Sequence, residues 1–120
     1  MKQDLMNLLQ MLRDELGAAL RGNLDQIVMY GSRARGDDTP DSDLDILLVL
    51  RDAGTGNREK AHQIVYQLMW DRGFDPLISM NIIDREYYQL LREAGSSYLQ
   101  NIQREGKPLW TESGTKPDIG

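Results

Sequence analysis

Leucines recur at steps of three and four residues over the first twenty positions of the chain. They are Leu5, Leu8, Leu9, Leu12, Leu16 and Leu20. This spacing places the leucines on one face of a helix and the polar residues between them on the other. The pattern predicts an amphipathic helix with one buried face, which Gly17 weakens and Gly22 ends.

Two apolar runs with the character of β-strands follow this helix. Residues 26–30 form the first run and residues 44–50 the second. Glycine, aspartate and proline lie between them, and these residues are typical of turns. We expect two strands joined by a turn or short helical segment, and then a loop over residues 52–57 that contains two glycines.

A second helix and a third strand are predicted next. Apolar residues at helical spacing favour a helix over residues 57–72, with Gly73 as its C-terminal stop. Residues 74–83 are predicted to form the third strand. Pro76 favours an edge position or a bulge near the start of this strand, because proline cannot donate a ladder hydrogen bond.

The last part of the chain predicts two short helices, over residues 85–94 and 96–105, separated at Gly95-Ser96. Asp84 is a candidate N-cap for the first of them. Residues 111–120 are polar and contain glycine and proline, so we expect a flexible tail.

The alternation of helices and strands predicts the α/β class, with a small mixed β-sheet and helices packed against it. A chain of 120 residues is long enough for one hydrophobic core, so we expect a single domain over residues 1–110.

Composition narrows the functional classes. The net charge of −5 argues against broad nucleic-acid binding, and no apolar stretch is long enough to span a membrane. The chain has no cysteine and a single histidine, His62, which argues against disulfides, zinc sites and thiol chemistry. The N-terminus lacks the pattern of a secretory signal, so we expect a cytoplasmic protein.

The segment from Met29 to Leu50 carries the candidate chemistry. Asp43 and Asp45 flank the start of the second strand, and residues two apart in a strand point to the same face. Two carboxylates on one face can share a divalent cation. Upstream, Gly31-Ser32 follows the first strand and forms a tight turn where a phosphate could bind. The segment therefore indicates nucleotide chemistry.

Other interpretations of these residues can be compared with their own requirements. A Walker-type phosphate loop would need lysine and serine or threonine where Asp37 and Asp38 stand. An EF-hand loop would need a glycine and a glutamate where Ile46 and Asp52 stand. Both interpretations fail, which leaves a solvated acidic turn as the alternative to a metal site. An aspartate directly before a strongly apolar run disfavours that alternative, because a buried unpaired charge is costly.

The spacing of Gly31-Ser32, ten residues and Asp43-x-Asp45 resembles the polymerase-β-like nucleotidyltransferase superfamily. The phrases Gly-Ser-Arg-Ala-Arg-Gly and Ser-Asp-Leu-Asp are typical of its minimal nucleotidyltransferase (MNT) branch. The resemblance implies that fold, ATP as substrate and two Mg²⁺ ions held by carboxylates. By this resemblance Asp43 and Asp45 are catalytic metal ligands, and Gly31 and Ser32 hold the phosphates.

Three further residues are candidates for the same site. Arg33 and Arg35 lie beside the acidic pair and could neutralise the triphosphate, or could balance the charge of nearby aspartates. Members of the superfamily commonly use a third carboxylate on a neighbouring strand, and Asp75 is the candidate for this metal ligand. The alternative for Asp75 is a turn residue before Pro76, and Asn81 and Asp84 are other candidates for the third position.

The resemblance also implies a partner. MNT proteins are often encoded beside a small helical HEPN toxin and act as its antitoxin, transferring AMP from ATP to a tyrosine of the toxin. Two alternatives stay open: a small-molecule nucleotidyltransferase that needs a partner subunit, and a non-catalytic antitoxin that neutralises its partner by binding.

Overall fold

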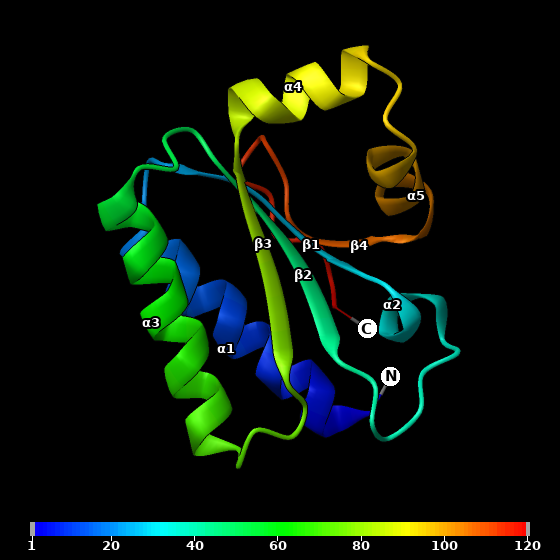
Figure 1. The fold of residues 1–120 in the computed structure, drawn as a ribbon. Helices are drawn as coiled ribbons and strands as arrows, with labels where there is room; N and C mark the ends of the chain where they lie inside the picture. The colour runs from blue at the N-terminus through cyan, green and yellow to red at the C-terminus, as the bar shows by residue number, and fades with distance from the viewer. Residues whose placement is uncertain (1, 120) are drawn as a thin grey trace.

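A computed structural model describes residues 2–119 and contains helices on both sides of one sheet (Figure 1). The helices are α1 (Gln3–Ala19), α2 (Ser32–Arg35), α3 (Thr55–Asp71), α4 (Arg85–Glu93) and α5 (Ser97–Glu105). The strands are β1 (Leu24–Tyr30), β2 (Leu44–Leu50), β3 (Ile78–Asp84) and β4 (Lys107–Trp110). The predicted class, a small mixed sheet with helices packed against it, is confirmed.

The sheet has the strand order β3-β2-β1-β4. β1 runs antiparallel to both of its neighbours, whereas β2 and β3 are parallel. A parallel pair needs a crossover connection, and α3 provides it between β2 and β3. β2 and β1 are therefore the central strands, and β1 ends where α2 begins.

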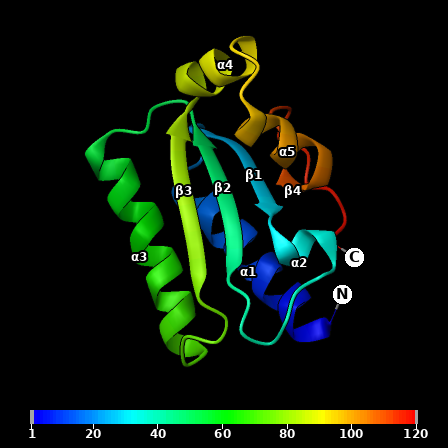
Figure 2. The same ribbon diagram turned by 45° about the vertical axis from the view of Figure 1, so that its right-hand side comes forward.

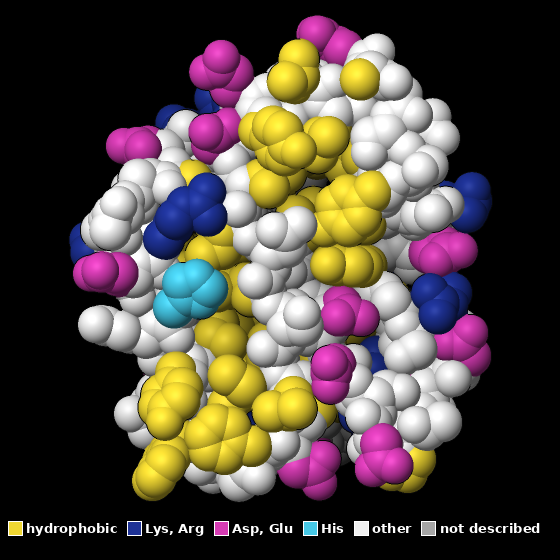
Figure 3. Space-filling view, viewed as in Figure 1, with side chains coloured by type: hydrophobic (Ala, Val, Ile, Leu, Met, Phe, Trp, Pro, Cys, Tyr) yellow, Lys and Arg dark blue, Asp and Glu magenta, His cyan; other side chains and the backbone are white. Residues whose placement is uncertain are grey.

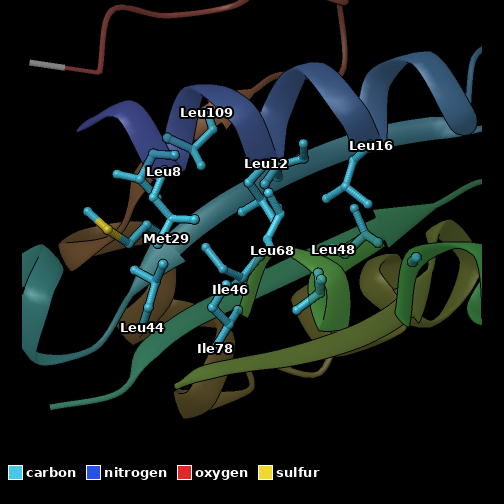
Figure 4. Packing of buried hydrophobic residues seen from close by; sticks show 14 of the residues in the cluster. Leu8, Leu12, Leu16, Met29, Leu44, Ile46, Leu48, Leu68, Ile78 and Leu109 are labelled. Atoms are coloured by element: carbon cyan, nitrogen blue, oxygen red, sulfur yellow. The ribbon is translucent and has the colours of Figure 1, made fainter. Parts of the chain in front are cut away.

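Side chains of the central strands alternate between two layers of helices. Leu44, Ile46 and Leu48 point into the larger core, which the leucine face of α1 and the apolar face of α3 complete (Figure 4). Leu47 and Val49 point the other way, toward α4 and α5. Figure 2 shows these two layers on opposite sides of the sheet.

The layer formed by α4 and α5 covers only part of its face of the sheet. Leu47 and Val49 of β2 are fully buried there, whereas Asp45 on the same face is only partly buried. Ser79 and Asn81 of the neighbouring β3 are exposed. The fold therefore leaves one end of this face open, next to the turn between β1 and α2.

Most of the predicted elements are confirmed, including the Asp84 N-cap, whose carboxylate accepts a hydrogen bond of 2.7 Å from the Tyr87 amide. The start of the third strand is wrong, because β3 begins at Ile78 rather than at residue 74. Strand β4 was not predicted. It has four residues at a sheet edge, and only Leu109 among them is buried, so its pattern is too short to recognise.

Residues 111–119 contain no helix or strand, yet they contact the rest of the chain. Ile119 is buried, and Arg13 donates a hydrogen bond of 3.1 Å to the carbonyl of Pro117. Lys116 lies 5.3 Å from the centre of the Trp110 ring. Flexibility of this segment stays a prediction, and these contacts tie it to α1 and β4. No helix within residues 2–119 is long and apolar enough to cross a membrane.

Candidate active site

The turn after β1 is built around Gly31. Its backbone angles, φ 79° and ψ −160°, belong to a region that is essentially restricted to glycine. The carbonyl of Gly31 accepts hydrogen bonds of 3.1 Å from the amides of Ala34 and Arg35, which starts α2. A β-carbon at Gly31 would overlap the carboxylate of Asp45. The turn is thus pressed against the second aspartate of the acidic pair.

Asp45 lies on the open face of the sheet, and the exposed Asp43 immediately precedes β2. Asp45 is the second residue of β2 and pairs with Tyr30 of β1 and Ser79 of β3. Burial raises the pKa of Asp45 above the ordinary range, the negative charge of Asp43 raises it further, and Arg35 partly opposes this. The charges of the two carboxylates therefore interact, although only Asp45 is on the strand and Asp43 lies just before it.

Acidic side chains also gather in the loop that leads into β2. Asp37, Asp38, Asp41 and Asp43 are all exposed, and Figure 3 shows acidic groups over this end of the molecule. Repulsion among neighbouring carboxylates favours the binding of a cation. The loop thus adds negative potential around the acidic pair.

The two candidate arginines have different surroundings. Arg33 is mostly buried and donates two hydrogen bonds, of 2.8 and 3.1 Å, to the carbonyl of Ser42, and it forms an ion pair with Asp38. Arg33 therefore fixes the acidic loop. Arg35 is more exposed and pairs with Asp37 and Glu105 at 3.2 and 3.5 Å, and these partners raise the pKa of its guanidinium. Arg35 is the arginine whose charge reaches Asp45.

Asp75 is exposed in the turn before β3. Because β3 begins only at Ile78, Asp75 is not on a strand beside the acidic pair. Within residues 2–119, no group of three or more Asp, Glu, His or Cys side chains is placed to hold a metal ion. The structure therefore does not bring Asp75 together with Asp43 and Asp45, and the strand position beside Asp45 holds the neutral Ser79.

A hydrogen-bonded network of side chains, which the sequence did not indicate, lies beside Asp45. Asn81 donates a hydrogen bond of 2.8 Å to the hydroxyl of Tyr98, which donates one of 3.3 Å to the hydroxyl of Tyr30. Burial, this hydrogen bond and the charge of Asp45 together raise the pKa of Tyr30 well above its usual range. No local pattern could have indicated Tyr98, because it reaches the site only through the packing of α5 on the sheet.

Residues 7–109 match the family described as nucleotidyltransferase domain. A curated relative is a candidate protein adenylyltransferase of Methanocaldococcus jannaschii. It is 24% identical over 95 residues, which cover 77% of this chain and 96% of the relative.

Solved structures show the same fold. One is a candidate nucleotidyltransferase of Sulfolobus solfataricus, with a TM-score of 0.58 and 18% identity over 95% of this chain and 86% of that chain. Another belongs to a toxin–antitoxin complex determined with AMP-PNP, with a TM-score of 0.54 and 22% identity over 88% of this chain and 73% of that chain.

Proposed function

Because the chain belongs to the nucleotidyltransferase domain family, we propose that it transfers AMP from ATP to a protein hydroxyl, a tyrosine of a partner HEPN toxin. The observation that carries this proposal is the acidic pair, Asp43 and Asp45, held against the Gly31-Ser32 turn on the open face of the sheet. The name of the M. jannaschii relative and the complex that contains AMP-PNP support the choice of an adenosine nucleotide.

The turn supplies the phosphate end of the site. The first amide groups of any helix have no partner within the helix, and no side chain caps α2. Gly31 brings the backbone close to Asp45 without a side chain in the way. The amides of Ala34 and Arg35 donate to the Gly31 carbonyl, which leaves those of Ser32 and Arg33. We assign these two amides and the Ser32 hydroxyl to the outer phosphates of ATP, and Arg35 to the balance of the negative charge.

The acidic pair fits Mg²⁺ that arrives with the nucleotide. Carboxylate oxygens are the ligands that Mg²⁺ prefers, and protein sites commonly supply one or two of them while substrate phosphates complete the coordination. Asp43 and Asp45 would hold the metal, which neutralises phosphate charge and polarises the α-phosphate when bound. A third carboxylate and a second Mg²⁺ ion are expected only from the resemblance to the superfamily. The position of Asp75, in the turn before β3, does not support its role as that third carboxylate.

The acceptor must approach over the same open face. In the transfer, the acceptor hydroxyl attacks the α-phosphorus, the bond to the oxygen shared with the β-phosphate breaks, and pyrophosphate leaves. A carboxylate on this face would accept the proton of the acceptor hydroxyl. The exposed surroundings of Ser79 and Asn81 leave room for a protein side chain.

Intact mass spectrometry tests the proposal. The partner HEPN protein is incubated with this chain, ATP and Mg²⁺, and a mass gain of one or more AMP units is expected. The variant Asp43→Asn, Asp45→Asn should abolish the gain. Asp41→Asn, which removes one charge from the exposed loop outside the pair, should retain it. Equal transfer by the wild type and the double variant would refute the proposal.

One observation favours a second candidate, the non-catalytic antitoxin. Only two carboxylates meet at the site among residues 2–119, whereas the superfamily commonly uses three. In this case the partner would gain no AMP and would still be neutralised, and the double variant would neutralise it as well as the wild type does.

A further inference from the structure

The hydroxyl of Tyr98 lies over strand β2, beside the acidic pair. Tyr30, which receives its hydrogen bond, pairs with Asp45 on one side of β2. Asn81, which donates to it, pairs with Leu47 on the other side of β2. A hydroxyl bonded to both must span β2 near Asp45. Tyr98 therefore places a phenol oxygen on the surface over which an acceptor hydroxyl would approach.

The Tyr98 side chain is held in place and remains accessible. Its ring meets the Tyr30 ring edge to face, with centroids 6.0 Å apart and an interplanar angle of 86°. It is 38% exposed, so a nucleotide on the open face can reach it. A reacting group fixed within a site has a high effective concentration, because the entropy of bringing it there is already lost.

The hydrogen bonds of Tyr98 also suit an acceptor. The amide of Asn81 donates to the phenol oxygen, so it stabilises the negative charge that this oxygen gains as its proton leaves. The Tyr98 hydroxyl donates its hydrogen bond to Tyr30, so one lone pair of the Tyr98 oxygen is left for the attack. Both contacts come from rigid strands rather than loops.

We propose that Tyr98 is an internal acceptor and that the protein adenylylates itself at this residue. The inference rests on the proposed function, since it uses the same site and the same ATP. A bond forms between the Tyr98 oxygen and the α-phosphorus, and the bond from that phosphorus to the oxygen shared with the β-phosphate breaks. Pyrophosphate leaves with the electron pair, and the phenol proton passes to water. The modified Tyr98 then blocks the approach of a protein acceptor.

Other tyrosines do not share this placement. Tyr30 is more buried than Tyr98. Tyr66 is 55% exposed, but it lies on α3, on the opposite side of the sheet, against Trp70 and Phe74. Tyr66 is therefore a matched control, because it is an exposed phenol with aromatic neighbours away from the site.

The test uses the full chain with ATP and Mg²⁺ and no partner, followed by intact mass spectrometry and peptide mapping. A gain of one AMP on the peptide that contains Tyr98 is expected. Tyr98→Phe should lose the gain entirely, and Tyr66→Phe should keep it. Circular dichroism of Tyr98→Phe checks the fold, which should be retained because only the hydroxyl is removed.

A second arm asks whether the transfer is internal. Isotope-labelled Asp45→Asn protein, which keeps Tyr98, is mixed with unlabelled wild type. Only the unlabelled chain should gain AMP, and a gain on the labelled chain would overturn the internal step.

A parallel reaction that contains the HEPN protein separates the two proposals. If the partner gains AMP while this chain alone gains none, or gains it at another residue, adenylylation of Tyr98 is overturned and the proposed function stands. If neither protein gains AMP, both are overturned.

Discussion

Gly31→Ala is the substitution that the site should tolerate least. The backbone at Gly31 has φ 79° and ψ −160°, and holding a non-glycine residue in such a region costs about 1–3 kcal/mol. The new methyl group would also overlap Asp45, whose side chain must leave its preferred rotamer at a cost of about 0.5–1.5 kcal/mol. The free energy of unfolding should therefore fall by roughly 2–4 kcal/mol.

The chemical effect follows from the same overlap. A reacting group displaced by about 1 Å can cost on the order of 100-fold in rate. Because Asp45 must move to accommodate the methyl group, AMP transfer to the HEPN protein should fall at least that far. Stabilisation of the protein by ATP and Mg²⁺ in thermal unfolding should be largely lost.

Gly36→Ala is the matched control. Gly36 also has a positive φ, 84°, but a β-carbon there meets no atom within 4 Å. It should lose only about 1–2 kcal/mol, from the left-handed conformation alone. Urea unfolding measures both variants, and mass spectrometry measures transfer. If Gly31→Ala transfers AMP at the rate of Gly36→Ala and is no less stable, the proposed contact between the turn and Asp45 is refuted.

Three further predictions follow from the arginines, the acidic pair and the last strand. Arg33→Ala should lower the free energy of unfolding by about 1–2 kcal/mol, because it removes hydrogen bonds that hold the acidic loop. Arg35→Ala should leave urea unfolding nearly unchanged and weaken ATP binding in calorimetry. A loss of stability in Arg35→Ala together with unchanged stability in Arg33→Ala would contradict these roles. Asp45→Asn should unfold at the same or a higher temperature than the wild type at neutral pH, because a carboxyl group with a raised pKa is penalised in the folded state while it is ionised. This difference should shrink as the pH falls and Asp45 takes up its proton, and a difference that grows would contradict the assignment. Leu109→Ala, at a side chain 1% exposed, should cost about 2–4 kcal/mol in urea unfolding, and the exposed Lys107→Ala should cost almost nothing. Equal losses would show that β4 contributes no core.

The sequence predicted the parts of the site that lie close together along the chain. Gly31 and Ser32 directly follow β1, Asp43 directly precedes β2, and Asp45 is the second residue of β2. The structure also shows why residue 31 is a glycine: the carboxylate of Asp45 lies where a β-carbon would be. Local patterning was sufficient here because the residues are joined by short connections.

Residues that reach the site from distant elements could not be predicted in this way. Tyr98 is placed there by the packing of α5. Asn81 was named only as a candidate for the third metal ligand, and its hydrogen bond to Tyr98 depends on the register of β3 beside β2. Asp75 was expected on the third strand, but this strand begins only at Ile78, so Asp75 lies in the turn before it. From the sequence, Arg33 could either bind the triphosphate or balance the charge of nearby aspartates. Its contacts with Ser42 and Asp38 indicate the second role.

The pairing of β1 with β4 has a consequence for synthesis on the ribosome. β1, which ends at Tyr30, lies between β2 and β4, and β4 comes from the far end of the chain (Figure 1). Contacts between distant segments form slowly, and a nascent chain cannot make them until the second segment has left the exit tunnel. The edge of β1 therefore stays unpaired until Trp110 has emerged. A chain that ends before that point would contain the whole acidic motif but an unfinished sheet.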